Sequence, residues 1–514
     1  MDRLKEVFKD RLFRVCIISG LIWTLLSHGM ALFNKYSYHD DIAAFNSVGS
    51  TYRLGRWTLG VMDSIVKTVM GGRHYSISLI NGLITALCIS LIVYLIAKKT
   101  EMTVNHILVL VVGVMISFPA ITGIFGYIFT APYYYFGALL GVLGAYIFYE
   151  KFNVITMIIS MTLMAFAVGT YQANIPICIC TLLIFMLNEV FRRENSWKEY
   201  WILALKNIFI CVGFMVEYFL INNYFLNKYN IALSEYRGIK NFGQTTIIGY
   251  FSRVLRAYKE FFNPTDDTSG NMFPFSIRYV HIILVGVTVL LAVSLCYQLF
   301  KKDKAKSVKI GIIIALYPLA AYFIYVMVDF SEIRGLMTFG EAFTFILLLW
   351  IYDKAAKEIR FNKIMMYTIT VLLCVLSFMY VRFSNICYLK AEMLQSQAIS
   401  YFTTLVTQIK STEGFSDETP IVYINEFKKL DKSFSETTVF EPIYIPPYQY
   451  DSIINNYMWE STMKFWCGFS PLKGDSSVFE NDKRVAEMPS YPDSGSIRCI
   501  DGTIVVKFEG NTTN

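Results

Sequence analysis

Charged residues are scarce in this sequence of 514 residues. Asp, Glu, Lys and Arg together make up 17% of the chain, whereas hydrophobic residues make up 55%. Such a chain is too apolar for a soluble globular protein, so lipid must be its main solvent. The formal net charge of +7 does not indicate nucleic-acid binding, because the Lys and Arg residues lie mostly in short loops between apolar runs. We therefore expect membrane lipid as a partner and no nucleic acid.

Several motifs of familiar enzyme chemistry are also missing. The sequence contains no Walker A loop, no G-x-S-x-G elbow and no His-rich metal motif. Its ten cysteines include no C-x-x-C pair, and most lie inside apolar runs, where they pack as small apolar residues. We therefore expect no metal site and no cofactor. Cys467 and Cys499 fall in the tail, where a disulfide and two free thiols both fit the sequence.

Apolar runs of about 17 to 22 residues, the length that crosses the hydrocarbon core, recur through residues 1–384. The first run follows a basic stretch and has no small-residue cleavage site after it, which favours a retained anchor and a cytoplasmic N-terminus. The pairs at 106–149 and 309–352 could each be a re-entrant hairpin. The sequence thus predicts an all-α polytopic membrane protein of about eleven transmembrane helices. They are placed near residues 15–33, 77–97, 106–125, 133–149, 154–171, 174–191, 201–221, 279–300, 309–330, 336–352 and 364–383.

The basic loops agree on one orientation, because alternation of the spans places them all on the cytoplasmic side. Two long loops, 34–76 and 222–278, then face outward, together with the tail 385–514. Residues 247–262 alternate apolar and basic side chains at helical spacing, which predicts a helix in the membrane surface. The tail is more polar. We expect a small extracytoplasmic α/β domain there, with a helix at 390–410 and strands at 419–426 and 502–510.

The densest polar cluster beside the membrane is YSYHDDIAAFNSVGSTYRLGRW, residues 36–57. A carboxylate there could take a proton from an acceptor hydroxyl, while an arginine holds a phosphate leaving group through its bidentate fork. The alternative is that the two aspartates cap an interfacial helix and that the arginines reach to lipid headgroups. The candidate residues are His39, Asp40, Asp41, Arg53, Arg56 and Trp57.

Two further charged clusters lie beside predicted spans. In DFSEIRGL, Arg334 could bind phosphate in the same cavity as the first loop, or could form an ion pair with Glu332 in a short turn. In NPTDDTSGNMFPF, Asp266 and Asp267 could bind a cation or a sugar, although Pro264 favours a solvated turn.

The acidic pair after the first helix, followed by LGRW (residues 54–57), resembles the Gtr type II family of bacterial membrane glucosyltransferases. The resemblance extends to the many-helix body, to Arg334 and to the last helix that leads into the tail. It implies a C-type glycosyltransferase fold and transfer of a hexose, glucose or a related sugar, from a polyprenyl-phosphate carrier to a surface polysaccharide, with inversion. It also implies that Asp40 or Asp41 is the base and that Arg56 and Arg334 hold the donor phosphate.

The resemblance further implies a location in the bacterial cytoplasmic membrane and a reaction that requires no divalent metal. Association with the donor-synthesising enzyme and with a flippase is an additional expectation. Two other functions remain open: a flippase or transporter for lipid-linked glycans, and a non-catalytic subunit of a glycan-assembly complex. A flippase would need charges deep inside its helices, and the predicted spans contain few.

Overall fold

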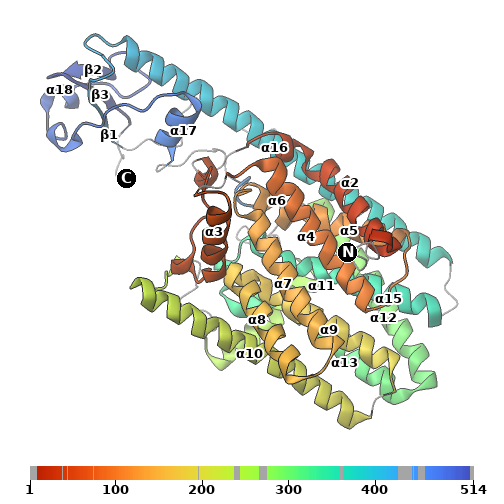
Figure 1. Cartoon of the computed structure of the whole chain (residues 1–514). Coiled ribbons are helices and arrows are strands. Elements are labelled where there is room, and N and C mark those ends of the chain that lie inside the picture. The colour runs from red at the N-terminus through yellow and green to blue at the C-terminus, as the bar shows by residue number, and fades with distance from the viewer. Residues whose placement is uncertain are drawn as a thin grey trace. The chain divides into compact units, whose positions relative to one another are not determined.

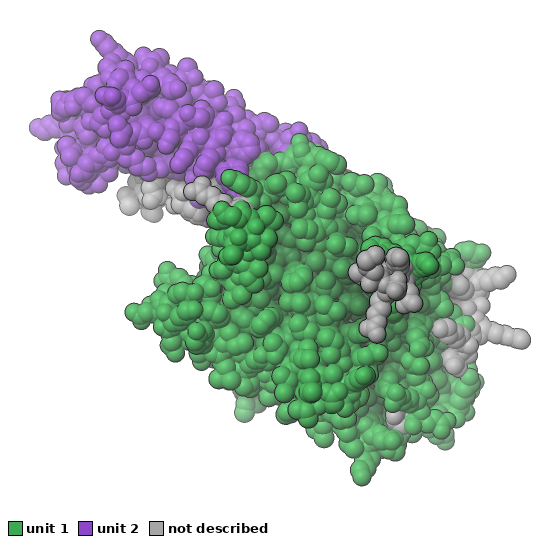
Figure 2. Space-filling view, viewed as in Figure 1, with its two compact units in different colours: residues 1–35, 46–387, 441–449 green, residues 36–45, 388–440, 450–514 purple. Residues whose placement is uncertain are grey.

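The computed structural model describes residues 8–36, 39–42, 44–72, 75–194, 196–236, 244–264, 275–358, 363–425, 443, 445–449 and 458–509. The described chain is mainly helical, with a small sheet near the C-terminus (Figure 1). It forms two compact units (Figure 2): unit 1 comprises residues 1–35, 46–387 and 441–449, and unit 2 comprises residues 36–45, 388–440 and 450–514. The domain boundary after residue 384 stays a prediction.

Every predicted apolar run coincides with helical structure, which confirms the all-α polytopic fold. Among the described residues, seven helices are long and apolar enough to cross a membrane, or up to eight with one bent pair. That the shorter helices Val154–Thr170, Lys304–Ala321 and Phe343–Glu358 also cross the membrane stays a prediction. The helices are α2 (Arg11–Phe33), α4 (Ser78–Lys99), α5 (His106–Ser117), α6 (Pro119–Phe125), α7 (Ala131–Glu150), α8 (Val154–Thr170), α9 (Ile175–Arg192), α10 (Trp197–Tyr229), α12 (Phe275–Lys302), α13 (Lys304–Ala321), α14 (Ile324–Met327), α15 (Phe343–Glu358) and α16 (Lys363–Ser411).

Polar residues before the apolar runs set several helix starts. The Ser196 side chain accepts a hydrogen bond from the backbone of Glu199, whose carboxylate in turn accepts one from the backbone of Ser196, and this capping box starts α10. Proline explains the break in the predicted span 106–125, where α5 and α6 are bent by 40°. Pro119 begins α6 and keeps Phe118 before it in extended backbone, so α5 ends at Ser117.

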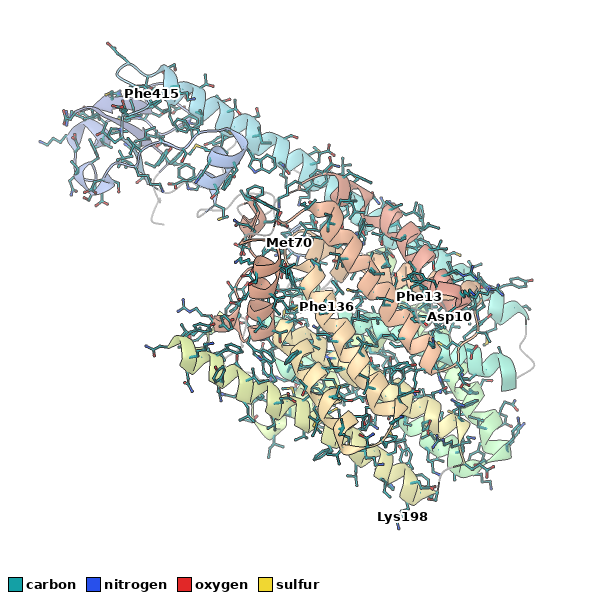
Figure 3. The ribbon with its side chains drawn as sticks, viewed as in Figure 1. Asp10, Phe13, Met70, Phe136, Lys198 and Phe415 are labelled. Carbon is teal, nitrogen blue, oxygen red and sulfur yellow. The ribbon has the colours of Figure 1, made fainter. Side chains whose placement is uncertain are left out.

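Large apolar side chains cover the outside of several helices. On α10, Leu205 and Phe209 are 62% and 58% exposed, and Phe136 on α7 (labelled in Figure 3) is 41% exposed. Apolar surface of this extent is unfavourable in water and stable against hydrocarbon. These faces identify the chain as a membrane protein.

The amphipathic helix predicted at residues 247–262 is α11 (Ile247–Phe262). Its apolar side chain Ile247 is 89% exposed, whereas Glu260 is only 3% exposed. Arg256 Nε lies 2.8 Å from Glu260 Oε1, and the Arg256 guanidinium lies 3.8 Å from the centre of the Phe330 ring. Arg256 and Glu260 therefore lie against the protein, whereas Ile247 faces outward. That the helix lies in the membrane surface stays a prediction.

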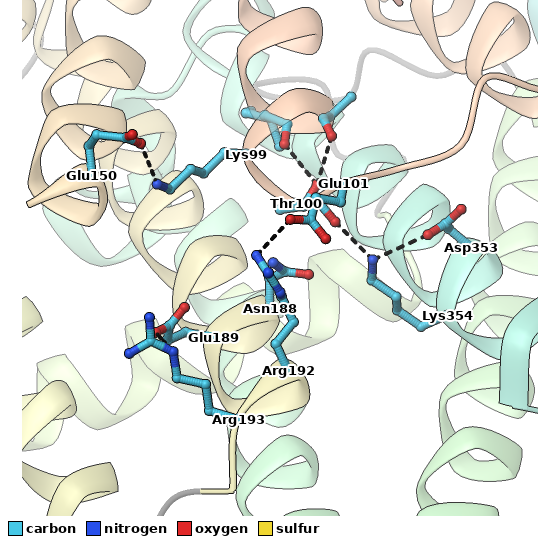
Figure 4. A network of polar contacts seen from close by, with 12 residues as sticks. Lys99, Thr100, Glu101, Glu150, Asn188, Glu189, Arg192, Arg193, Asp353 and Lys354 are labelled. Carbon is cyan, nitrogen blue, oxygen red and sulfur yellow. Dashed lines mark hydrogen bonds and ion pairs between the residues drawn. The ribbon is translucent and has the colours of Figure 1, made fainter.

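A buried lysine fastens α15 to the connection between α4 and α5 (Figure 4). Lys354 and Asp353 are 4% and 2% exposed. Lys354 Nζ donates to the carbonyl of Thr100 at 2.8 Å and lies 3.2 Å from Asp353 Oδ2. Asp353 Oδ1 also accepts from the backbone of Thr103 at 3.0 Å. The exposed ion pairs drawn beside it contribute less, because water screens them.

Unit 2 contains a three-stranded sheet in the order β1-β3-β2. β1 (Ile421–Ile424) pairs parallel with β3 (Thr503–Lys507), and β2 (Ile497–Ile500) pairs antiparallel with β3. β1 and β3 confirm the two predicted strands, β2 was not predicted, and the helix predicted at 390–410 is the end of α16. Short helices α17 (Trp459–Trp466) and α18 (Lys483–Ala486) complete the described part. The core consists of Val422, Ile424, Phe479, Val485, Met488, Ile500 and Val505.

The cysteines all lie in described segments and all ten are free. Cys467 Sγ lies 3.8 Å from Thr403 Oγ1. Of the two alternatives left open by the sequence, the structure therefore has free thiols at Cys467 and Cys499.

A short segment of the tail, residues 445–449, is part of unit 1. Within this segment, Ile445 is fully buried. A methyl group at Gly126 would lie 2.4 Å from Pro447 Cγ, so this contact requires glycine there. The neighbouring helix α6 contacts the 3-10 helix Gly335–Met337, which directly follows Arg334.

Candidate active site

The LGRW motif forms a tight turn at the start of a helix. The 3-10 helix Tyr52–Leu54 ends at Gly55, whose φ is +66°, and α3 (Trp57–Val69) begins two residues later. Glycine adopts this left-handed backbone without the steric cost that other residues carry. The backbone N–H of Arg56 donates to the carbonyl of Thr51 at 3.0 Å. The turn therefore fixes Arg56 just before α3.

Two side chains from distant segments hold this turn. Gln172, which follows α8, donates from Nε2 to the carbonyl of Leu54 at 2.6 Å. Tyr218 of α10 donates its hydroxyl hydrogen to the carbonyl of Gly55 at 3.1 Å, and it accepts from Gln172 Nε2 at 3.1 Å. Buried carbonyls need such partners, because an unpaired one is costly. The position of Arg56 therefore depends on residues from three parts of the chain.

Arg56 lies against a pair of stacked tyrosine rings. Tyr134 and Tyr171 are parallel within 7°, with ring centres 4.2 Å apart. The Arg56 guanidinium lies 5.5 Å and 5.2 Å from those two ring centres, within the range of cation–π attraction. Its Nε is buried and donates to no acceptor in the described part of the chain. Among the described residues, no carboxylate forms an ion pair with Arg56.

Arg334 lies in the irregular segment between α14 and α15. Its guanidinium donates from one nitrogen to the carbonyls of Ser331 and Ile333, at 3.0 Å and 3.1 Å. The helix before this segment, α14, is held from α11, where Arg253 donates to the carbonyl of Val326 at 3.4 Å. Arg334 is thus placed by a folded loop rather than by a regular helix.

Arg56 and Arg334 line the same cavity of unit 1, which has a volume of about 290 Å³. The two arginines come from segments far apart in the sequence, and uncharged side chains form the rest of the wall. This arrangement suits a small ligand that carries negative charge at one end. The remaining wall residues are Tyr171, Gln172, Ala173, Ile175, Tyr218, Phe219, Asn222, Asn223, Leu226, Leu233, Tyr236, Ile324, Met327, Val328, Leu336 and Met337.

The acidic pair lies in unit 2, in the 3-10 helix His39–Ile42. Asp40 is exposed, whereas Asp41 is 1% exposed. The two carboxylates therefore differ in exposure, a difference that the sequence does not show. Their catalytic role stays a prediction.

The other candidate residues lie outside the wall of the arginine cavity. Arg53 is exposed, and its carbonyl accepts from the backbone of Ser234 at 2.8 Å. Trp57 is 2% exposed and packs edge-on against Phe166, with ring centres 5.2 Å apart, as a core residue does. Glu332 is half-buried in the loop before Arg334. The roles proposed for these residues stay predictions.

Three candidates cannot be placed as side chains. His39 is described in its backbone alone, and Asp266 and Asp267 lie outside the described residues.

Several wall residues were not predicted from the sequence. Gln172, Tyr218 and Asn222 lie within or at the ends of apolar runs, where no motif marks them. A polar side chain at such a place is costly unless it has a partner or a function. That cost is the one sequence signal that could have identified them.

Unit 1 is thus a polytopic membrane body with a cationic cavity beside a glycine turn. The family described as Glucosyl transferase GtrII matches residues 29–349, and the chain belongs to this family. Both Arg56 and Arg334 lie inside the matched segment, and membership makes the protein a membrane glucosyltransferase. No curated protein and no solved structure matches the chain significantly.

Proposed function

We propose that the protein transfers a hexose from a polyprenyl-phosphate carrier to a surface polysaccharide at the outer face of a bacterial cytoplasmic membrane. The observation that supports this proposal best is the cavity that Arg56 and Arg334 share. A guanidinium partly removed from water is unfavourable without a counter-anion, and Arg56, which is half-buried, has no carboxylate partner among the described residues. The phosphate of the donor supplies that anion.

The reaction follows from this placement of charge. The oxygen of an acceptor hydroxyl attacks the anomeric carbon, the bond from that carbon to the phosphate oxygen breaks, and polyprenyl phosphate leaves with the electron pair. One displacement inverts the anomeric centre. Negative charge grows on the phosphate as the bond breaks, so two guanidinium groups stabilise the transition state more than the ground state. The step requires no divalent cation.

A second cavity favours a lipid-linked donor. It has a volume of about 580 Å³ and an almost wholly apolar lining from α11, α12, α13 and α15. Pro318 lines this apolar cavity, and Ile324, a few residues further along the chain, lines the arginine cavity. A hydrocarbon chain gains about 0.8 kcal/mol for each methylene group that it buries. We propose that the first isoprene units of the donor occupy this space.

The proton of the acceptor hydroxyl requires a base, and we propose Asp40. A base must reach the hydroxyl directly. Asp40 is exposed, whereas Asp41 is 1% exposed and is the better candidate for a supporting role. We therefore expect Asp40→Asn to abolish transfer and Asp41→Asn to reduce it mainly through stability.

The test uses the full-length protein in proteoliposomes, with radiolabelled polyprenyl-phosphate glucose and candidate surface glycans. Arg56→Met and Arg334→Met should each lower the transfer rate by roughly 10²- to 10³-fold, the usual effect of removing one oxyanion donor. Lys206→Met is the matched control, because Lys206 lies over the Phe152 ring at 4.3 Å and is not part of the cavity wall. It should transfer at the wild-type rate.

Transfer that survives both arginine substitutions and Asp40→Asn would overturn the proposal. Movement of the lipid between leaflets without transfer to any glycan would instead identify a flippase. Unfolding titrations of each variant in detergent separate loss of chemistry from loss of fold.

A further inference from the structure

One face of α10 forms the part of the arginine cavity that carries neutral polar groups. Tyr218, Phe219, Asn222, Asn223 and Leu226 all line the cavity. Tyr218, Asn222 and Leu226 are spaced four residues apart, as are Phe219 and Asn223, so the five side chains share one broad face of the helix. This face offers amides and aromatic rings rather than charges, which is the chemistry that binds a sugar ring rather than a phosphate.

Asn222 differs from the other buried amide of the same helix. Its side chain is 4% exposed, and its Oδ1 accepts no hydrogen bond from any described residue. Asn207, 6% exposed, is fully engaged: its Oδ1 accepts from the Tyr149 hydroxyl at 3.0 Å, and its Nδ2 donates to the carbonyl of Leu203 at 2.9 Å. An unpaired amide oxygen in a membrane helix is unfavourable, and a bound ligand can remove that cost.

The missing partner must be a hydrogen-bond donor. An amide oxygen only accepts, whereas a phosphate at neutral pH presents acceptor oxygens, so the two do not pair. A sugar hydroxyl donates as well as accepts. The oxygen also lies close to the turn that carries Arg56, because a methyl group at Gly55 would lie 3.6 Å from Asn222 Oδ1. A ligand with a phosphate at Arg56 thus places its next chemical group near Asn222.

We infer that Asn222 accepts a hydrogen bond from a hydroxyl of the hexose to be transferred, and that this contact selects the sugar of the donor. The inference rests on the proposed function, because it assumes a sugar phosphate in this cavity. Arg56 and Arg334 then bind the phosphate that every donor shares, and Asn222 distinguishes one sugar from another.

The test compares binding of polyprenyl phosphate and of polyprenyl-phosphate glucose to full-length protein in nanodiscs. Asn222→Ala should weaken binding of the glucosylated lipid roughly tenfold and leave binding of the bare phosphate lipid unchanged. Arg56→Met should weaken binding of both lipids. Asn207→Ala is the matched control, a buried amide of the same helix, and should leave both affinities unchanged while lowering thermal stability.

A set of monodeoxy-glucose donors identifies the hydroxyl. For the donor that lacks it, wild-type protein and Asn222→Ala should bind equally well, whereas the other donors still distinguish them. If Asn222→Ala weakens neither lipid, or both to the same extent, the sugar contact is wrong. If wild-type protein binds neither lipid, the proposed function itself fails.

Discussion

Substitution of Gly55 provides a direct test of how the LGRW turn places Arg56. Gly55 has a φ of +66°, and an alanine in this left-handed backbone costs about 1–2 kcal/mol. The added methyl group would also lie 2.5 Å from Tyr218 Oη and 2.8 Å from Gln172 Nε2. Both atoms are hydrogen-bonded to the turn, so they cannot withdraw without leaving its carbonyls unpaired. Crowding of this kind costs about 1–3 kcal/mol more.

Gly71 is a matched control for the backbone cost. Its φ is +72°, and a methyl group there would meet no atom within 4 Å. Gly71→Ala should therefore show only the left-handed cost of about 1–2 kcal/mol and keep full transfer activity. Gly55→Ala should unfold at lower denaturant, and its transfer rate should fall by more than about tenfold, since about 1.4 kcal/mol of lost transition-state binding suffices for that factor.

A double substitution separates crowding from other effects. Tyr218→Phe removes the hydroxyl that the new methyl group would meet, and by itself costs about 1 kcal/mol for the lost hydrogen bond. In the Gly55→Ala background it should cost nothing or restore stability, so the two changes should not be additive. The assays are an unfolding titration in mixed micelles and transfer in proteoliposomes. Additive effects, or a Gly55→Ala protein that behaves like Gly71→Ala in both assays, would refute this account of the turn.

Three further predictions concern stability and covalent state. Lys354→Met should lower the free energy of unfolding by about 3–5 kcal/mol, because it leaves the buried Asp353 carboxylate without its cation. Adding Asp353→Asn should recover part of that loss. An unfolding titration in which the double mutant is the least stable protein would contradict this prediction. In unit 2, hydrogen bonds from Arg484 hold the pKa of Asp482 and of Asp501 below the usual range. The resulting stabilisation is present above the ordinary carboxyl pKa of about 3.9 and is lost as pH falls through the lowered pKa values. In a plot of unfolding free energy against pH, Arg484→Gln should therefore reduce the loss of stability on the acid side. An unchanged acid side would count against the pairing. Thiol titration of protein denatured without reductant should find ten free thiols, and two fewer would reveal a disulfide.

The helices could be predicted because hydrocarbon imposes a simple rule on sequence. A span must be apolar for most of its length, and all the predicted runs coincide with helices. Breaks within a span are harder to predict, because the average hydropathy of a run does not reveal the effect of a single proline. Pro119, for example, divides one predicted span into two helices. β2 was missed for a different reason, since its four residues carry little alternation of their own and depend on pairing with β3.

The sequence marks the two arginines of the cavity wall but not its neutral residues, and the phosphate-binding role of the arginines stays a prediction. An arginine beside an apolar run is conspicuous, so the sequence alone marks Arg56 and Arg334 as candidates. Gln172 and Leu54, which form one of the hydrogen bonds that fix the turn, are 118 positions apart in the chain. Only the packing of α8 against α3 and of α10 against the turn brings such residues together, and no local sequence pattern predicts it.

The proposed donor matches the polar groups of the arginine cavity in hydrogen-bonding capacity. Arg56 only donates and carries charge, so an anion suits it; Asn222 Oδ1 only accepts, so a donor such as a hydroxyl suits it. Both needs are met when phosphate and hydroxyls belong to one small molecule, and a sugar phosphate meets that condition. The apolar cavity near Pro318 adds a third requirement, for hydrocarbon, that a soluble sugar phosphate does not satisfy. A sugar linked through phosphate to a prenyl chain satisfies all three, which is why the two cavities together favour a lipid-linked donor more strongly than either does alone.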